Sequence, residues 1–102
     1  MNYLEKYNIK KEEITKIKKH FNKDIVNKFN VMEYQVCKVL DYLSSLGIKN
    51  LKDIIQNRPD ICFMDLELLK SKTEKFDKNL IKFIFENEVD NLMNFDIWFN
   101  IK

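Results

Sequence analysis

The chain has almost none of the residues that interrupt helices, with one glycine, Gly47, and one proline, Pro59, among its 102 residues. Turn-rich β architectures need these two residue types at many positions. Their scarcity favours helices joined by short polar turns. A chain of this length is expected to bury a single core. We therefore predict one mostly α-helical domain over residues 1–102.

Side chains that carry catalysis or hold cofactors are also scarce. The one histidine, His20, lies in the string KKHFNK, where a surface position is expected rather than a general base. Cys37 and Cys62 form no CxxC pair and have apolar neighbours, so we expect both to be reduced and buried. The sequence has no glycine-rich phosphate loop and no GxSxG or HExxH motif. We expect no enzyme activity, no cofactor and no metal site.

The sequence lacks any apolar run near the ~18 residues that a membrane-spanning helix needs. The N-terminal string MNYLEKYNIKKEE has no apolar core of the kind that signal peptides contain, so we expect a cytoplasmic protein. The abundance of Lys, Asn and Ile, with no alanine, is typical of translation from an AT-rich genome, such as that of a plasmid or phage.

A strong overall charge is also missing, because the formal net charge is only +2. The charge is unevenly distributed, however, since residues 1–38 carry nine lysines against five acidic residues. An anionic partner is therefore expected to meet the N-terminal third of the chain first.

Hydrophobic periodicity predicts four helices, at residues 10–21, 36–46, 50–57 and 65–76. Gly47 is predicted to end the second helix in a left-handed conformation. Asn50 and Asp65 are predicted N-caps of the third and fourth. Pro59 is expected to stop the third, because the residue before a proline avoids the α region.

The C-terminal segment 80–102 fits two structures. Its first part, LIKFIFENEV, has apolar residues at helical spacing, whereas FDIWFNIK at residues 95–102 alternates apolar and polar residues, as a strand does. The sequence leaves a helix and a β-hairpin open here.

Three similar phrases recur along the chain, within NKDIVNKFNV (residues 22–31), RPDICFMDL (58–66) and VDNLMNFDI (89–97). Each phrase has an Asp or Asn, two apolar residues, an aromatic residue or Met, a second Asp or Asn, and an aliphatic residue. A short amphipathic segment precedes each one. Spacings of 36 and 31 residues fall in the range of repeat arrays, so short helix-turn-helix repeats stacked in one domain are predicted.

The middle unit resembles the repeat of the mitochondrial transcription termination factor family. Leu46-Gly47, Arg58-Pro59 and Ile61-Cys62 occupy the places of that family's Leu-Gly step, Arg/Asn-Pro turn and paired apolar residues. The resemblance covers residues 42–76, and the flanking units lack both the Leu-Gly step and the proline. It implies a helical solenoid that binds double-stranded nucleic acid along a basic face.

A second resemblance is to small winged helix-turn-helix domains, with an α+β fold. In that alternative the C-terminal hairpin, at about residues 80–102, forms the wing, with strands at 80–87 and 95–102. The helix at 65–76 would then be expected in the major groove. Both resemblances imply nucleic-acid binding.

The basic residues form the strongest functional pattern. Lys16, Lys19 and Lys23 have the i, i+3, i+7 spacing that puts side chains on one face of a helix, opposite the apolar face. Such a row of lysines can follow phosphates and release counterions. Further predicted contacts are Lys28, Lys70, Lys72, Lys75 and Arg58, the only guanidinium, which suits bidentate phosphate or guanine recognition.

We therefore predict a small, non-catalytic protein that binds nucleic acid, with duplex DNA as the expected partner and a homodimer left open. The aromatic residues Tyr3, Tyr7, Tyr34 and Trp98 are expected to pack at core edges or at a dimer interface, and base stacking is the alternative. The alternative function is a protein-interaction module with no nucleic-acid role.

Overall fold

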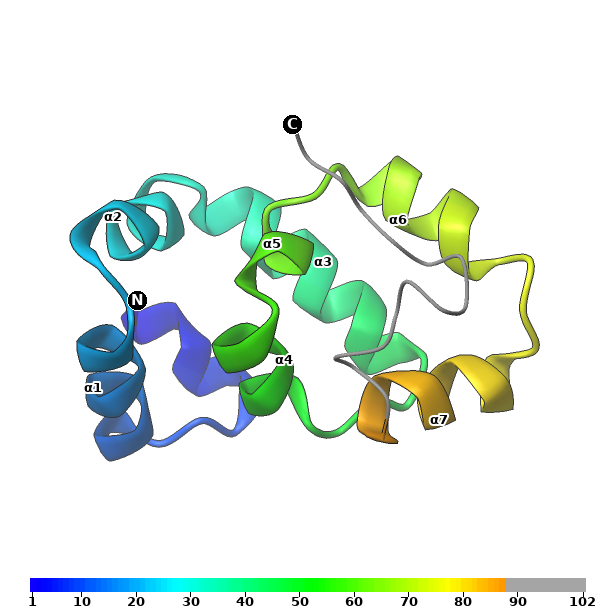
Figure 1. Ribbon diagram of the computed structural model, residues 1–102, viewed down its shortest axis with the longest axis horizontal. Coiled ribbons are helices and arrows are strands. Elements are labelled where there is room, and N and C mark those ends of the chain that lie inside the picture. Colours follow the sequence, from blue (N-terminus) through cyan, green and yellow to red (C-terminus); the bar gives the residue numbers. More distant parts are fainter. Residues whose placement is uncertain (88–102) are drawn as a thin grey trace.

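The computed structural model describes residues 1–87, which form eight helices and no strand (Figure 1). In chain order they are the 3-10 helix η1 (Asn2–Tyr7) and the α-helices α1 (Lys11–His20), α2 (Lys23–Val31), α3 (Glu33–Ser45), α4 (Leu51–Asn57), α5 (Pro59–Cys62), α6 (Leu66–Thr73) and α7 (Lys78–Asn87). The predicted mostly helical class is confirmed. None of the described helices is both long and apolar enough to cross a bilayer.

Helix α3 is the centre of the structure, packing against α2, α4, α5 and α6 (Figure 1). Its buried stripe recurs at helical spacing and consists of Val36, Val39, Leu40 and Leu43. The helix ends as the sequence predicts, because Gly47 takes a φ of 85°. The N–H groups of Gly47 and Ile48 donate to the carbonyls of Ser44 and Leu43, which is the Schellman pattern of hydrogen bonds.

Short helices follow in the middle of the chain. Helix α4 ends at Asn57, before Pro59, as predicted, and Pro59 then opens the four-residue α5. Asn50 is the N-cap residue of α4, as predicted, but its side chain makes no capping hydrogen bond. Its Nδ2 instead donates to the carbonyl of Phe85 at 3.0 Å and ties the start of α4 to α7.

Helix α6 begins at the predicted cap, since the Asp65 side chain accepts a hydrogen bond from the N–H of Leu68. It ends at Thr73, earlier than the predicted Phe76. The Thr73 hydroxyl donates to the carbonyl of Leu69 and lies 2.6 Å from the Tyr42 hydroxyl of α3. These bonds to the preceding turn and to α3 fix the end of the helix, because Ser and Thr compete with the helical hydrogen bonds.

The predicted helix at residues 10–21 is shorter and is followed at once by another. It ends at His20, Phe21 is extended, and α2 begins at Lys23 with Asn22 as its cap. The first recurring phrase thus lies in the nine-residue α2, whereas the middle phrase forms α5 and the turn into α6. Two similar stretches of sequence therefore adopt different secondary structures. The third phrase, at 89–97, lies outside the described residues.

Residues 80–87 belong to α7 and not to a strand. Ile81, Ile84 and Phe85 are buried at the i, i+3, i+4 spacing of a helix, and this apolar stripe explains why the helical period prevails over a wing strand. The winged-helix alternative is therefore wrong for its first strand. The second predicted strand, at 95–102, and Trp98 lie beyond the part that the structure describes.

Candidate nucleic-acid interface

The most basic stretch of the described chain lies where α1 turns into α2. Residues 16–23 contain four lysines and one histidine and no acidic residue. All four lysines are exposed, and within residues 1–87 none of them forms an ion pair. We call these four, Lys16, Lys18, Lys19 and Lys23, the basic corner.

The basic corner differs from the predicted row of lysines on a single helix. Lys16 and Lys19 are on α1, but Lys23 is the first residue of α2, so the prediction that all three share one helix face is wrong. The break occurs because the Asn22 side chain accepts a hydrogen bond from the N–H of Ile25 at 3.0 Å and starts a new helix. The lysines remain neighbours in sequence but face solvent around a bend.

The N-terminal amine adds positive charge beside this corner. The Met1 ammonium donates to the Asn30 side-chain oxygen at 2.8 Å, which joins the chain start to α2. Burial lowers the pKa of this amine, the charge of Lys18 lowers it further, and Glu33 opposes the change. Lys18 is thus close enough to the amine for their charges to interact.

Lys28 lies apart from the basic corner. Its ammonium is 5.5 Å from the centre of the Phe63 ring, beside α5. Together with Asp60 and Pro59 it lines an open groove between α2 and α5. Its position makes it a neighbour of α5 rather than part of the surface formed by Lys16 and Lys19.

Arg58 does not present an open guanidinium fork. Its Nε and Nη2 donate to the two carboxylate oxygens of Asp60 at 3.0 and 2.8 Å. The Arg58 side chain is also largely covered, with 17% of its surface exposed. The fork geometry that was predicted to recognise phosphate or guanine is used here within the protein, to connect the ends of α4 and α5.

The predicted lysines of α6 form a separate set. Lys70 is half-buried, with its ammonium 5.7 Å from the centre of the Tyr42 ring. Lys72 is half-buried, and Lys75 is exposed two residues beyond the end of α6. Helices α1 and α6 lie at opposite ends of the long axis in Figure 1. The eight predicted residues are therefore not brought together on one surface.

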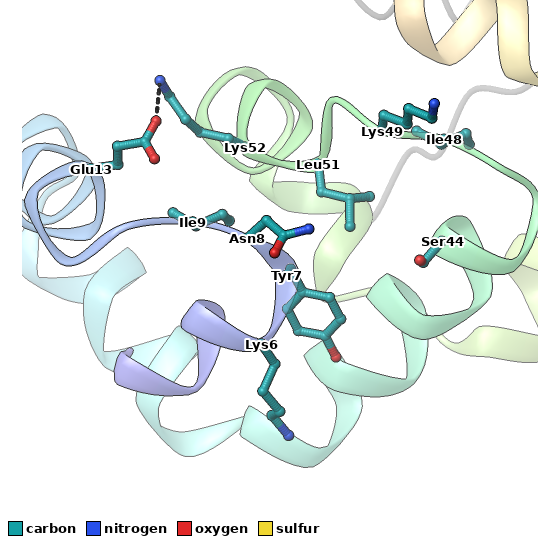
Figure 2. A pocket seen from close by; sticks show the side chains of 10 residues that line it. All are labelled: Lys6, Tyr7, Asn8, Ile9, Glu13, Ser44, Ile48, Lys49, Leu51 and Lys52. Carbon is teal, nitrogen blue, oxygen red and sulfur yellow. Dashed lines mark ion pairs between the residues drawn. The ribbon is translucent and has the colours of Figure 1, made fainter.

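A cleft of about 390 Å³ lies between η1, α1, the end of α3 and the start of α4. Three lysines line it, Lys6, Lys49 and Lys52. Figure 2 shows Lys6 and Lys49 extending away from each other, while Lys52 turns to Glu13. The Lys52–Glu13 ion pair measures 2.9 Å and joins α4 to α1. The cleft has a positive rim, but its ammonium groups do not converge on one point.

The predicted aromatic residues have different roles. Tyr3 donates to the carbonyl of Phe29 at 2.6 Å, and Tyr7 donates to the Asp41 carboxylate at 2.8 Å, so both hold η1 against the helices. Tyr34 is 77% exposed. Val31, three residues earlier in the chain, is 84% exposed, a feature that no pattern in the sequence indicated because its spacing suits a helix interior equally well.

The remaining side chains with possible catalytic or metal-binding chemistry are those of His20, Cys37 and Cys62. His20 is exposed, and its ring lies 5.2 Å from that of Phe21. Both cysteines are free, Cys62 fully buried and Cys37 only half-buried. Within residues 1–87, no three metal-ligating side chains gather into a group.

No family model, no curated protein and no solved structure matches this chain.

Proposed function

We propose that this protein binds the phosphate backbone of duplex nucleic acid, with DNA as the expected form, through the basic corner and without catalysis. One observation carries the proposal: residues 16–23 hold four exposed lysines, no acidic residue and, within the described part of the chain, no internal ion pair. Unpaired lysines at this density repel one another, and a polyanion relieves that repulsion while releasing its counterions.

The position of Lys23 supports an anionic partner. As the first residue of α2 it adds a positive charge at the end where the helix dipole is already positive. Asp24, in the same turn, offsets part of this charge. A phosphate oxygen placed here would meet both the Lys23 ammonium and the positive end of the helix dipole.

The resemblance of residues 42–76 to mitochondrial transcription termination factor repeats supports the same partner. Over this segment the chain forms α3, the short α4, the four-residue α5 that Pro59 opens, and α6. Ile61 and Cys62, at the places of the paired apolar residues, are fully buried. The stacked-repeat arrangement belongs to the proposal only for this segment, since the phrase at 24–31 has a different structure.

A protein-interaction module is the second candidate function. It is favoured by the apolar side chains of Val31 and Tyr34, which are 84% and 77% exposed. The two residues are three positions apart in the chain, and contiguous exposed apolar patches are typical of interaction surfaces. Neither residue is one of the four lysines of the basic corner, so one function does not exclude the other.

The test is a comparison of two triple variants in binding to a labelled DNA duplex at low salt. Lys16→Ala/Lys19→Ala/Lys23→Ala removes charge from the basic corner, and Lys70→Ala/Lys72→Ala/Lys75→Ala removes the same charge from the α6 set. The first variant should lose at least tenfold in affinity and the second much less. Equal losses would show that only overall charge matters, and absence of wild-type binding would favour the second candidate.

A further inference from the structure

An open groove of about 340 Å³ separates α2 from α5. Its walls are mainly apolar, with one charged side chain from each helix. The lining residues are Ile25, Lys28, Met32, Pro59, Asp60 and Phe63. The groove thus carries a positive group on its α2 side and a negative group on its α5 side.

Two large apolar side chains at the junction of α2 and α3 are exposed. Val31 follows Lys28 by three residues on α2, which places the two about 60° apart around the helix axis. Val31 is 84% exposed and Tyr34, at the start of α3, is 77% exposed. The Lys38 ammonium lies 4.8 Å from the centre of the Tyr34 ring, and the rest of the Tyr34 side chain, like that of Val31, faces solvent.

We propose that a second copy of this chain docks on this surface to form a symmetric dimer. In a two-fold interface the same patch meets itself, so a patch must supply both partners of each contact. This surface supplies both partners of an apolar contact, in the exposed side chains of Val31 and Tyr34 and in the groove. It also supplies both partners of an ion pair, Lys28 and Asp60. Val31 and Tyr34 of one copy enter the groove of the other, and Lys28 faces Asp60 of the second copy.

The balance of charge argues for self-association rather than for a partner of a single charge sign. A two-fold arrangement brings each Lys28, which has no carboxylate partner within residues 1–87, to the Asp60 of the other copy, where the charges are opposite. The internal pair with Arg58 does not prevent this, because each carboxylate oxygen accepts more than one hydrogen bond. The dimer goes beyond the proposed function, and its proposed contacts use none of the four lysines of the basic corner.

The first test is sedimentation equilibrium over a range of protein concentrations, in the absence of nucleic acid. The wild-type protein should dimerise, and Val31→Glu and Tyr34→Glu should each weaken dimerisation at least tenfold. These side chains are exposed, so the variants should keep the fold. The matched control is Phe83→Glu, which changes a 52% exposed apolar residue on α7 and should leave the dimer unchanged. A wild-type monomer throughout, or a Val31→Glu dimer as tight as the wild type, would overturn the proposal.

A second test exchanges the charges. Lys28→Asp alone and Asp60→Lys alone each put like charges face to face in both halves of the dimer, so each should be monomeric. Mixing the two variants should restore dimers, because both contacts then join opposite charges. Circular dichroism shows whether each variant folds. If Asp60→Lys does not fold, the dimerisation of Val31→Glu compared with that of the wild type decides whether the proposed dimer exists. A mixture of folded variants that stays monomeric would contradict the proposed pairing.

Discussion

The side-chain oxygen of Asn22 lies 3.0 Å from the backbone nitrogen of Ile25 and accepts its hydrogen bond. This one bond sets the start of α2 and turns the chain out of α1. It therefore determines that Lys23 faces solvent on a different helix from Lys16 and Lys19. The shape of the basic corner depends on a capping residue that carries no charge itself.

We predict that Asn22→Ala lowers the free energy of unfolding by about 1 kcal/mol, the usual cost of losing an N-cap. Urea denaturation followed by circular dichroism measures this change. Asn22→Asp is the control, because its side chain accepts the same hydrogen bond and also suits the positive end of the helix. An Asn22→Ala protein as stable as the wild type would show that the cap does not hold the α1–α2 turn.

Gly47→Ala should cost about 1 kcal/mol of unfolding free energy. Gly47 has a φ of 85°, where a Cβ is strained. The new Cβ would meet only the Lys82 side chain at 3.7 Å, an ordinary contact, so the cost comes from the backbone and not from a clash. Gly47→Asn should cost less, since Asn tolerates this conformation better. Thermal unfolding should rank the three proteins, from most to least stable, as wild type, Gly47→Asn and Gly47→Ala. Any other order would contradict this account.

Cys62 should resist alkylation in the folded protein while Cys37 reacts. Burial raises the pKa of the Cys62 thiol well above its ordinary value of 9.0, so the nucleophilic thiolate does not form. Iodoacetamide labelling read by mass spectrometry should modify Cys62 only after denaturant is added. Rapid labelling of Cys62 under native conditions would contradict its burial.

The raised pKa of Cys62 also makes the stability of the fold depend on pH. Above about pH 9 the unfolded thiol loses its proton and the folded one keeps it, so the free energy of unfolding should fall as pH rises. Cys62→Val should weaken this fall, which denaturation at pH 8 and pH 10 measures. If the free energy of unfolding fell equally in the variant, the fall would come from other titrating groups.

Much of the fold follows from local sequence signals. The stripe of α3, its end at Gly47, the stop before Pro59 and the Asp65 cap all depend on residues within a turn of one another. The sequence does not predict the break between α1 and α2, because the i, i+3, i+7 spacing of Lys16, Lys19 and Lys23 suits a single helix that runs across it. There the competing signal, an Asn that caps a new helix, prevailed over that spacing.

The candidate site was less predictable, because it depends on contacts between distant residues. Sequence spacing does not reveal that Lys28 lies over Phe63 or that Lys70 lies over Tyr42. The Arg58–Asp60 pair joins residues only two positions apart, but it depends on the turn between α4 and α5. It also gives no sign that Val31 is exposed. The string of lysines at residues 16–23 was visible from the start, since neighbours in sequence stay close however the helices pack.

The most direct test of the central claim is the dependence of duplex DNA affinity on salt concentration. If the four lysines of the basic corner each meet a phosphate, the logarithm of affinity should fall against the logarithm of salt with a slope of about −3 to −4. Lys16→Ala/Lys19→Ala/Lys23→Ala should reduce the magnitude of that slope by roughly 2 to 3. A flat response of the wild type, or the same slope in the triple variant, would contradict the account.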